Sequence, residues 1–143
     1  MRIDLSLALI LFCSASASFA ARTPPPPEHP ILGTWEFTEA GEDCSELYHF
    51  RSDGTTLVTS GAEVAELEYQ IVADPSPKGF YRIESTVVKD NGKQDCAGEL
   101  TEVGQRATIF IQLLPSGEAI TMCQSESTDA CFGPLRRVPG QDS

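Results

Sequence analysis

The chain of 143 residues has few of the side chains on which most catalytic and metal sites depend. Its only histidines are His29 and His49, and it contains no His-Glu-x-x-His run, no Gly-x-Ser-x-Gly elbow and no phosphate-binding glycine loop. Carboxylates such as Glu66 and Glu68 alternate with apolar residues, which favours a solvated strand face over acid–base chemistry. We therefore expect a protein that is not an enzyme and that has no catalytic residues, no metal site and no cofactor.

Positive charge is also scarce. Ten Lys and Arg residues stand against twenty-one Asp and Glu residues, which gives a net charge of −11. Binding to nucleic acid or to anionic membrane surfaces depends on Lys and Arg contacts, so both kinds of partner are disfavoured. Two interpretations of this charge stay open: it favours a basic protein as partner, or it only keeps the exported domain soluble.

A membrane-spanning helix needs a run of about 18 or more apolar residues, and the sequence contains no such run. The N-terminus has Arg2, a short apolar run over residues 5–12 and small residues up to Ala20, which is the layout of a cleavable export signal. We expect cleavage after about Ala20, a periplasmic or secreted protein, and no membrane anchor in the mature form. Cys13 follows Phe12 rather than a small residue, which disfavours a lipoprotein.

Four cysteines would remain after cleavage: Cys44, Cys96, Cys123 and Cys131. An even number of cysteines in an exported chain predicts disulfides, and none of these has the short two-to-four-residue spacing that is typical of structural zinc sites. Four cysteines allow three pairings. Local closure favours Cys123 with Cys131, eight residues apart, which leaves Cys44 with Cys96.

The chain reads as one domain with short appendages. After the signal peptide at residues 1–20, residues 21–30 contain four consecutive prolines, which predict a stiff extended arm or linker. Residues 31–138 show no break in composition and predict a single domain. Residues 139–143 are expected to form a disordered tail.

Alternation of apolar and polar residues with a period of two predicts eight or nine short strands and no helix. Asp90-Asn91-Gly92 is the strongest turn signal, and we expect it to lead into a strand at 96–102. The expected strands are 33–38, 46–51, 55–60, 67–71, 81–87, 96–102, 106–114, 118–124 and 131–138. Because closure removes the exposed edges of a sheet, we expect an all-β antiparallel up-and-down meander that closes into a small barrel.

Gly33-Thr34-Trp35 on the first strand, together with Arg136 or Arg137 on the last, resembles the lipocalin and calycin barrels. The resemblance implies that Trp35 lies at the closed end of the barrel and that one of the two arginines packs across it. The domain is also similar in size, disulfide use and export to the small periplasmic inhibitors of bacterial metalloproteases and lysozymes.

Inward-facing residues of such a barrel are candidates to line a ligand cavity, or they fill the interior, which we expect in so narrow a barrel. Beside Trp35 the candidates are Phe37, Tyr48, Phe50, Tyr69, Tyr81, Ile109 and Ile111. The first functional hypothesis is an exported non-catalytic binding protein that engages a protein partner in the envelope, as a hydrolase inhibitor or immunity protein does. The alternatives are a lipocalin-like carrier of a small hydrophobic ligand and a structural envelope protein.

Overall fold

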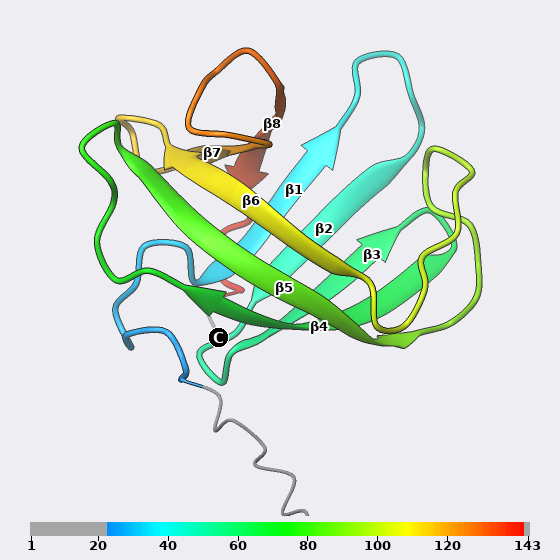
Figure 1. Cartoon of the computed structure of the whole chain (residues 1–143). Coiled ribbons are helices and arrows are strands. Elements are labelled where there is room, and N and C mark those ends of the chain that lie inside the picture. Colours follow the sequence, from blue (N-terminus) through cyan, green and yellow to red (C-terminus); the bar gives the residue numbers. More distant parts are fainter. Residues whose placement is uncertain (1–22, 142–143) are drawn as a thin grey trace, which may run out of the picture.

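The computed structural model describes residues 23–141, so the expected signal peptide and Cys13 lie outside the described residues. The described chain is all β: eight antiparallel strands follow one another in sequence order and close into a barrel (Figure 1). This confirms the expected fold class. The strands are β1 (Gly33–Thr38), β2 (Ser45–Phe50), β3 (Thr55–Ser60), β4 (Glu63–Ile71), β5 (Phe80–Asp90), β6 (Arg106–Leu113), β7 (Ala119–Cys123) and β8 (Cys131–Arg137). Within residues 23–141, no helix is long and apolar enough to cross a bilayer.

The predicted strand at 96–102 is wrong. Residues 91–105 form one long loop between β5 and β6, which pair directly with each other. The turn signal at Gly92 is real, since Gly92 has a φ of 71° and its N–H donates to Oδ1 of Asp90 at 2.7 Å. A second turn follows at once, because Asp95 accepts hydrogen bonds from the N–H groups of Gly98 and Glu99. Two turns so close together leave no extended segment that could join the sheet.

One end of the barrel is closed by Trp35 and Arg137. Trp35 is fully buried, and its Nε1 donates a hydrogen bond to the carbonyl of Ile31 at 2.8 Å. The guanidinium carbon of Arg137 lies 4.1 Å from the centre of the Trp35 ring, a cation–π contact. The same guanidinium donates to the carbonyls of Leu32 and Pro30, both at 2.9 Å. Arg137 thus joins the last strand to the first strand and to the segment that precedes it.

Of the two arginines that the resemblance offered, only Arg137 makes this contact. Trp35 pairs with Arg137 across β1 and β8, and Glu36 pairs with Arg136. Because paired residues of neighbouring strands face the same side, Arg136 lies with Glu36 on the outer face, where both are exposed.

The segment that precedes β1 covers the closed end rather than extending away from it (Figure 1). Pro25 and His29 are buried. Nδ1 of His29 accepts a hydrogen bond from the N–H of Ile31 at 3.2 Å, and Nε2 lies 3.0 Å from the carbonyl oxygen of Val72. An imidazole that accepts at one nitrogen and donates at the other is neutral, and burial lowers the pKa of His29 accordingly.

Apolar side chains fill the half of the barrel next to this closed end. The core cluster consists of Ile31, Trp35, Phe50, Tyr69, Ile83, Ile111, Ile120, Met122 and Leu135. Phe37, Tyr48, Ile71, Ile109, Leu113 and Phe132 pack against it. About half of the barrel is therefore filled, and that half supplies most of the hydrophobic stabilisation of the domain.

Replacing Arg137 by Ala should lower the free energy of unfolding by about 2–4 kcal/mol, because it removes the cation–π contact and two charge-assisted hydrogen bonds. Arg136→Ala is the matched control, with an expected change of about 0.5 kcal/mol or less. Urea unfolding followed by Trp35 fluorescence measures both. Equal effects of the two variants would contradict the assigned role of Arg137.

Candidate functional site

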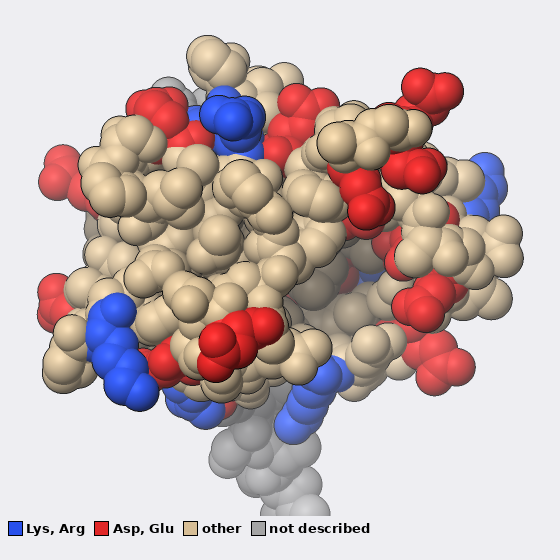
Figure 2. Space-filling model, turned by 90° about the horizontal axis from the view of Figure 1, so that it is seen from above, with Lys and Arg blue, Asp and Glu red and all other residues tan. Residues whose placement is uncertain are grey.

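The opposite end of the barrel is hollow. A pocket of about 220 Å³ opens there, and Figure 2, which looks down on this end, shows the hollow with acidic side chains on part of its rim. It is lined by β2 to β6 and by the 91–105 loop. The lining residues are Glu46, Tyr48, Val58, Ser60, Glu63, Ala65, Leu67, Ser85, Val87, Asp95, Thr101, Gln105, Arg106 and Ala107. The expectation of a filled interior is therefore right for one half of the barrel and wrong for the other.

Cross-strand rows determine which side chains meet inside the pocket. Glu46, Ser60 and Glu63 form the outermost row of β2, β3 and β4, at the mouth. In the next row Tyr48 pairs with Val58, and Val58 pairs with Ala65. The pocket thus has carboxylates at its entrance and mostly apolar walls below.

An irregularity in β5 adds the carboxylate of Asp90 to the second row, beside Ala65. Glu66 pairs with Lys89 while Leu67 pairs with Val87, so Val88 has no partner on β4 and forms a β-bulge. After the bulge, Asp90 pairs with the inward residue Ala65, and Lys89 points outward, where its Nζ lies 3.1 Å from Oε1 of Glu66. A regular strand would have placed Lys89 on the inner face. The bulge therefore brings Asp90 to the pocket side and keeps the lysine out.

Glu63 is the least satisfied of these acids. It is 5% exposed, and its Oε1 is buried without a hydrogen-bond partner among the described residues. Burial raises the pKa of Glu63. A hydrogen bond with the Thr101 side chain opposes this rise, and the negative charges of Asp90, Asp95 and Glu46 add to it. Oδ2 of Asp90 is likewise buried without a partner.

Tyr48 orders one side of the pocket. Its hydroxyl donates a hydrogen bond to Oε2 of Glu46 at 2.8 Å. Burial, followed by this hydrogen bond and the nearby carboxylates, raises the pKa of Tyr48, so the phenol stays neutral. Glu46 is held as a hydrogen-bond acceptor beside the mouth.

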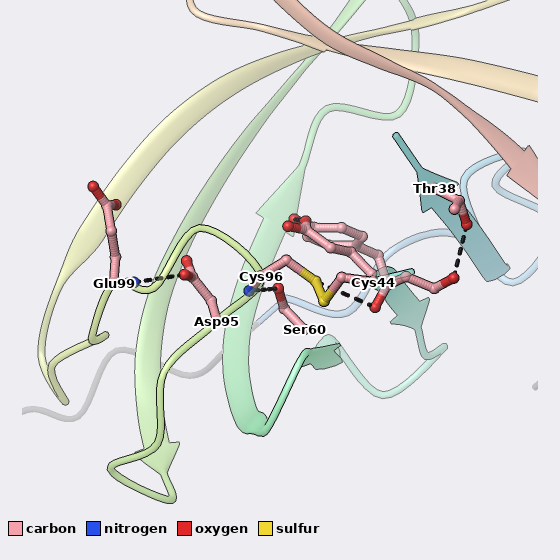
Figure 3. Close-up of a disulfide and its surroundings, with 9 residues drawn as sticks. Thr38, Cys44, Ser60, Asp95, Cys96 and Glu99 are labelled. Atoms are coloured by element: carbon pink, nitrogen blue, oxygen red, sulfur yellow. Dashed lines mark hydrogen bonds between the residues drawn. A yellow bond between two sulfur atoms is a disulfide. The ribbon is translucent and has the colours of Figure 1, made fainter. Parts of the chain in front are cut away.

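A disulfide fixes the loop that covers the pocket. Cys44 is bonded to Cys96, and Cys123 to Cys131, which confirms the favoured pairing. Cys44 precedes β2, whereas Cys96 lies in the 91–105 loop, and its N–H donates to Oγ of Ser60 at 3.0 Å (Figure 3). The bond spans 52 residues, and a link of that length stabilises the fold by about 4 kcal/mol in the loop-entropy account.

Gly61 allows the loop to come this close. Its φ is 59°, and a Cβ at this position would lie 3.2 Å from the backbone carbon of Asp95. The disulfide and this close approach together hold Asp95 and Thr101 over the pocket.

Most of the residues that the sequence analysis named as candidates to line a cavity lie outside the pocket. Trp35, Phe50, Tyr69 and Ile111 belong to the buried core, and Phe37 and Ile109 pack against it. Tyr81 is half-buried with its ring against His29 at 4.9 Å. Of the nominated residues, Tyr48 lines the pocket.

Sequence reasoning missed the carboxylates of the pocket, although a signal for Glu63 existed. The alternation assigned to residues 67–71 extends back through Ala65 to Glu63, which places the three side chains Glu63, Ala65 and Leu67 on one face. No comparable signal exists for Asp90, whose orientation depends on the bulge.

The charges of the pocket are unbalanced. Arg106 is the only Lys or Arg among the lining residues. Among residues 23–141, Arg51 and Lys89 pair with Glu66 and Arg82 pairs with Glu84, and none of these ion pairs joins Arg106 to a pocket carboxylate. In the same range no three His, Cys, Asp or Glu side chains are grouped so that they could hold a metal ion. Comparisons with family models, curated proteins and solved structures found no match to this chain.

Replacing Glu63 by Gln should stabilise the protein at pH 7.5 by about 0.5–2 kcal/mol, since it removes a buried charge that none of these ion pairs compensates. Because the folded-state pKa of Glu63 is raised, the wild type regains stability as the pH falls through that pKa towards the ordinary value of 4.5, where Glu63 is neutral too. The advantage of the variant should therefore shrink on acidification. Thermal unfolding between pH 4.5 and 8 measures this, and a variant that is less stable than wild type at pH 7.5 would contradict it.

Proposed function

We propose that this protein is a non-catalytic, lipocalin-like binding protein that takes up a small ligand in the hollow half of its barrel. The observation that supports this most directly is the pocket itself, because the other half of the same barrel is tightly filled. Concave sites with apolar walls and a few buried polar groups are the usual binding sites for small molecules.

The size of the pocket limits the ligand. A volume of about 220 Å³ corresponds to roughly seven water molecules at about 30 Å³ each. Pockets for drug-sized ligands usually measure about 300–1,000 Å³. The ligand is therefore a small compound, and a retinoid or a long fatty acid would not be enclosed.

We also propose that the protein acts after export, in the periplasm or outside the cell. The two disulfides are compatible with an oxidising compartment. The Cys44–Cys96 bond holds the loop over the pocket, so an oxidising compartment would preserve the site itself.

Filling the pocket should abolish ligand binding. Ala65 is 3% exposed and points into the pocket, whereas its neighbour Val64 is 44% exposed on the outer face. We expect Ala65→Phe to prevent binding and Val64→Phe to leave it intact. The measurement is a screen of small compounds by amide NMR shifts, with native mass spectrometry of the purified protein for a co-purifying ligand. The proposal fails when no compound binds, or when binding survives in a folded Ala65→Phe variant.

A protein partner is the second candidate, and a specific feature of the 91–105 loop favours it. Leu100 and Val103 are 62% and 63% exposed on this loop, which the disulfide anchors. Exposed apolar side chains on a fixed loop are suitable anchors for an interface. A partner that binds wild type should be lost from the double variant Leu100→Ser, Val103→Ser, whereas small-compound binding in the pocket should be unaffected. Retention of the partner by that variant would count against this interface.

A further inference from the structure

We infer that the pocket is selective for an organic cation: a primary ammonium group on a short apolar stem, with the ammonium group at Glu63 and the stem against the apolar wall below. This inference rests on the proposed function and names the chemical class of the ligand. A free amine and a lysine side chain of a protein share this chemistry.

The first argument comes from the unpaired carboxylate oxygens. Oε1 of Glu63 and Oδ2 of Asp90 are buried without partners among residues 23–141. A neutral apolar ligand would offer these oxygens no hydrogen-bond donor, so they would stay unpaired, which is costly. An anion would add repulsion. An ammonium group supplies three N–H donors and the opposite charge, so it is the group that complements the carboxylate of Glu63, which lines the pocket.

The second argument is that these acids are not all needed for loop structure. Oδ1 of Asp90 accepts the N–H of Gly92, and Oδ1 of Asp95 accepts the N–H of Glu99, so both help to shape the 91–105 loop. Glu63 and Glu46 belong to strands: Glu46 accepts the hydroxyl of Tyr48, and Glu63 makes a hydrogen bond with the Thr101 side chain that leaves its Oε1 without a partner in the described part of the chain. A buried carboxylate on a strand lowers the stability of the fold. Its presence there therefore favours a role in binding.

The third argument is the apolar wall beneath the carboxylates. Val58, Ala65 and Val87 are 8%, 3% and 6% exposed and lie in or below the row under Glu63. A hydrated metal ion would gain nothing from this wall, and the acids are not grouped as metal ligands. A short hydrocarbon stem gains about 0.8 kcal/mol for each CH₂ group that it buries. The combination of acids above and hydrocarbon below therefore fits an amphipathic cation.

Several groups face Glu63 and determine the pH dependence. They are Glu46 and Tyr48 on β2, Ser60 on β3, Asp90 on β5, Asp95 and Thr101 on the loop, and Arg106 on β6. Burial and the nearby carboxylates raise the pKa of Tyr48, so its phenol stays neutral beside Glu63. A cation binds the ionised form of Glu63, and binding should weaken as the pH falls through the raised folded-state pKa of Glu63.

The test compares three six-carbon probes of similar shape at pH 7.5: n-hexylamine, n-hexanol and sodium hexanoate. They are titrated into the disulfide-intact protein and followed by amide NMR shifts of the pocket residues. We expect the amine to bind at least about tenfold more tightly than the alcohol, and hexanoate to bind most weakly. Lowering the pH to 4.5 should weaken amine binding by wild type more than by Glu63→Gln.

Two variants serve as controls for Glu63→Gln, which should weaken amine binding about tenfold. Glu36→Gln removes the same charge from an exposed position on β1 and should change binding by less than about twofold. Arg106→Gln removes the one lining cation and should bind the amine at least as tightly as wild type does. Amide spectra confirm that each variant is folded.

The outcomes separate the inference from the proposed function. Equal binding of amine and alcohol, with no effect of Glu63→Gln, overturns the cation inference and leaves the pocket a ligand site. If no probe binds, and N-acetyl-lysine methylamide does not bind either, both fail. Binding of the lysine amide without binding of n-hexylamine supports the cation inference and replaces a free ligand with a lysine of a partner protein.

Discussion

The contact of Arg137 with Trp35 is the interaction on which the closed sheet most depends. The two end strands of the meander pair through Trp35 with Arg137 and Glu36 with Arg136, and the N–H of Val138 donates to the carbonyl of Thr34 at 2.9 Å. The guanidinium of Arg137 extends that short seam by bonding to the carbonyls of Leu32 and Pro30. In a sheet that opened at this seam, the first and last strands would be edges with unpaired backbone groups, and Trp35 would lose its cover.

The barrel has two halves with different roles: the half next to the Trp35–Arg137 contact is filled, and the opposite half holds the pocket. The core cluster behind Trp35 provides the burial on which folding depends, so the opposite half is free to keep a cavity and unpaired acids. A cavity and a buried unpaired charge both reduce stability. The Cys44–Cys96 bond acts against that reduction at the end where it occurs. The stabilising and destabilising features are thus arranged along one axis of the same small domain.

The sequence predicted the architecture well because alternation and closure are local and general constraints. It predicted Trp35 at the closed end, but it did not distinguish Arg136 from Arg137. A signal for that choice existed, because Leu135 is fully buried and Arg137 lies two residues after it on the same face of β8, whereas Arg136 faces outward. The register shift between β7 and β8 lies before Leu135, so it does not alter the alternation from Leu135 to Arg137.

The pocket was harder to predict, because its shape depends on contacts between residues that lie far apart in the chain. Glu63 was readable from the alternation of β4, but its significance depends on what covers it. The cover is the 91–105 loop, for which sequence reasoning predicted a strand. Position in that loop is determined by a disulfide and by the close approach at Gly61, both of which join residues far apart in the chain.

The bulge at Val88 has a consequence for how this protein could change during evolution. If the bulge were lost with every residue kept, the regular alternation of β5 would pair Lys89 with Ala65 and turn Lys89 inward, towards Glu63 and the other acids. The protein would then hold its own ammonium group in the place where the pocket now accepts one from outside. A one-residue shift in the register of β5 is therefore a short evolutionary route between a barrel that binds a cation and a barrel that is neutralised internally.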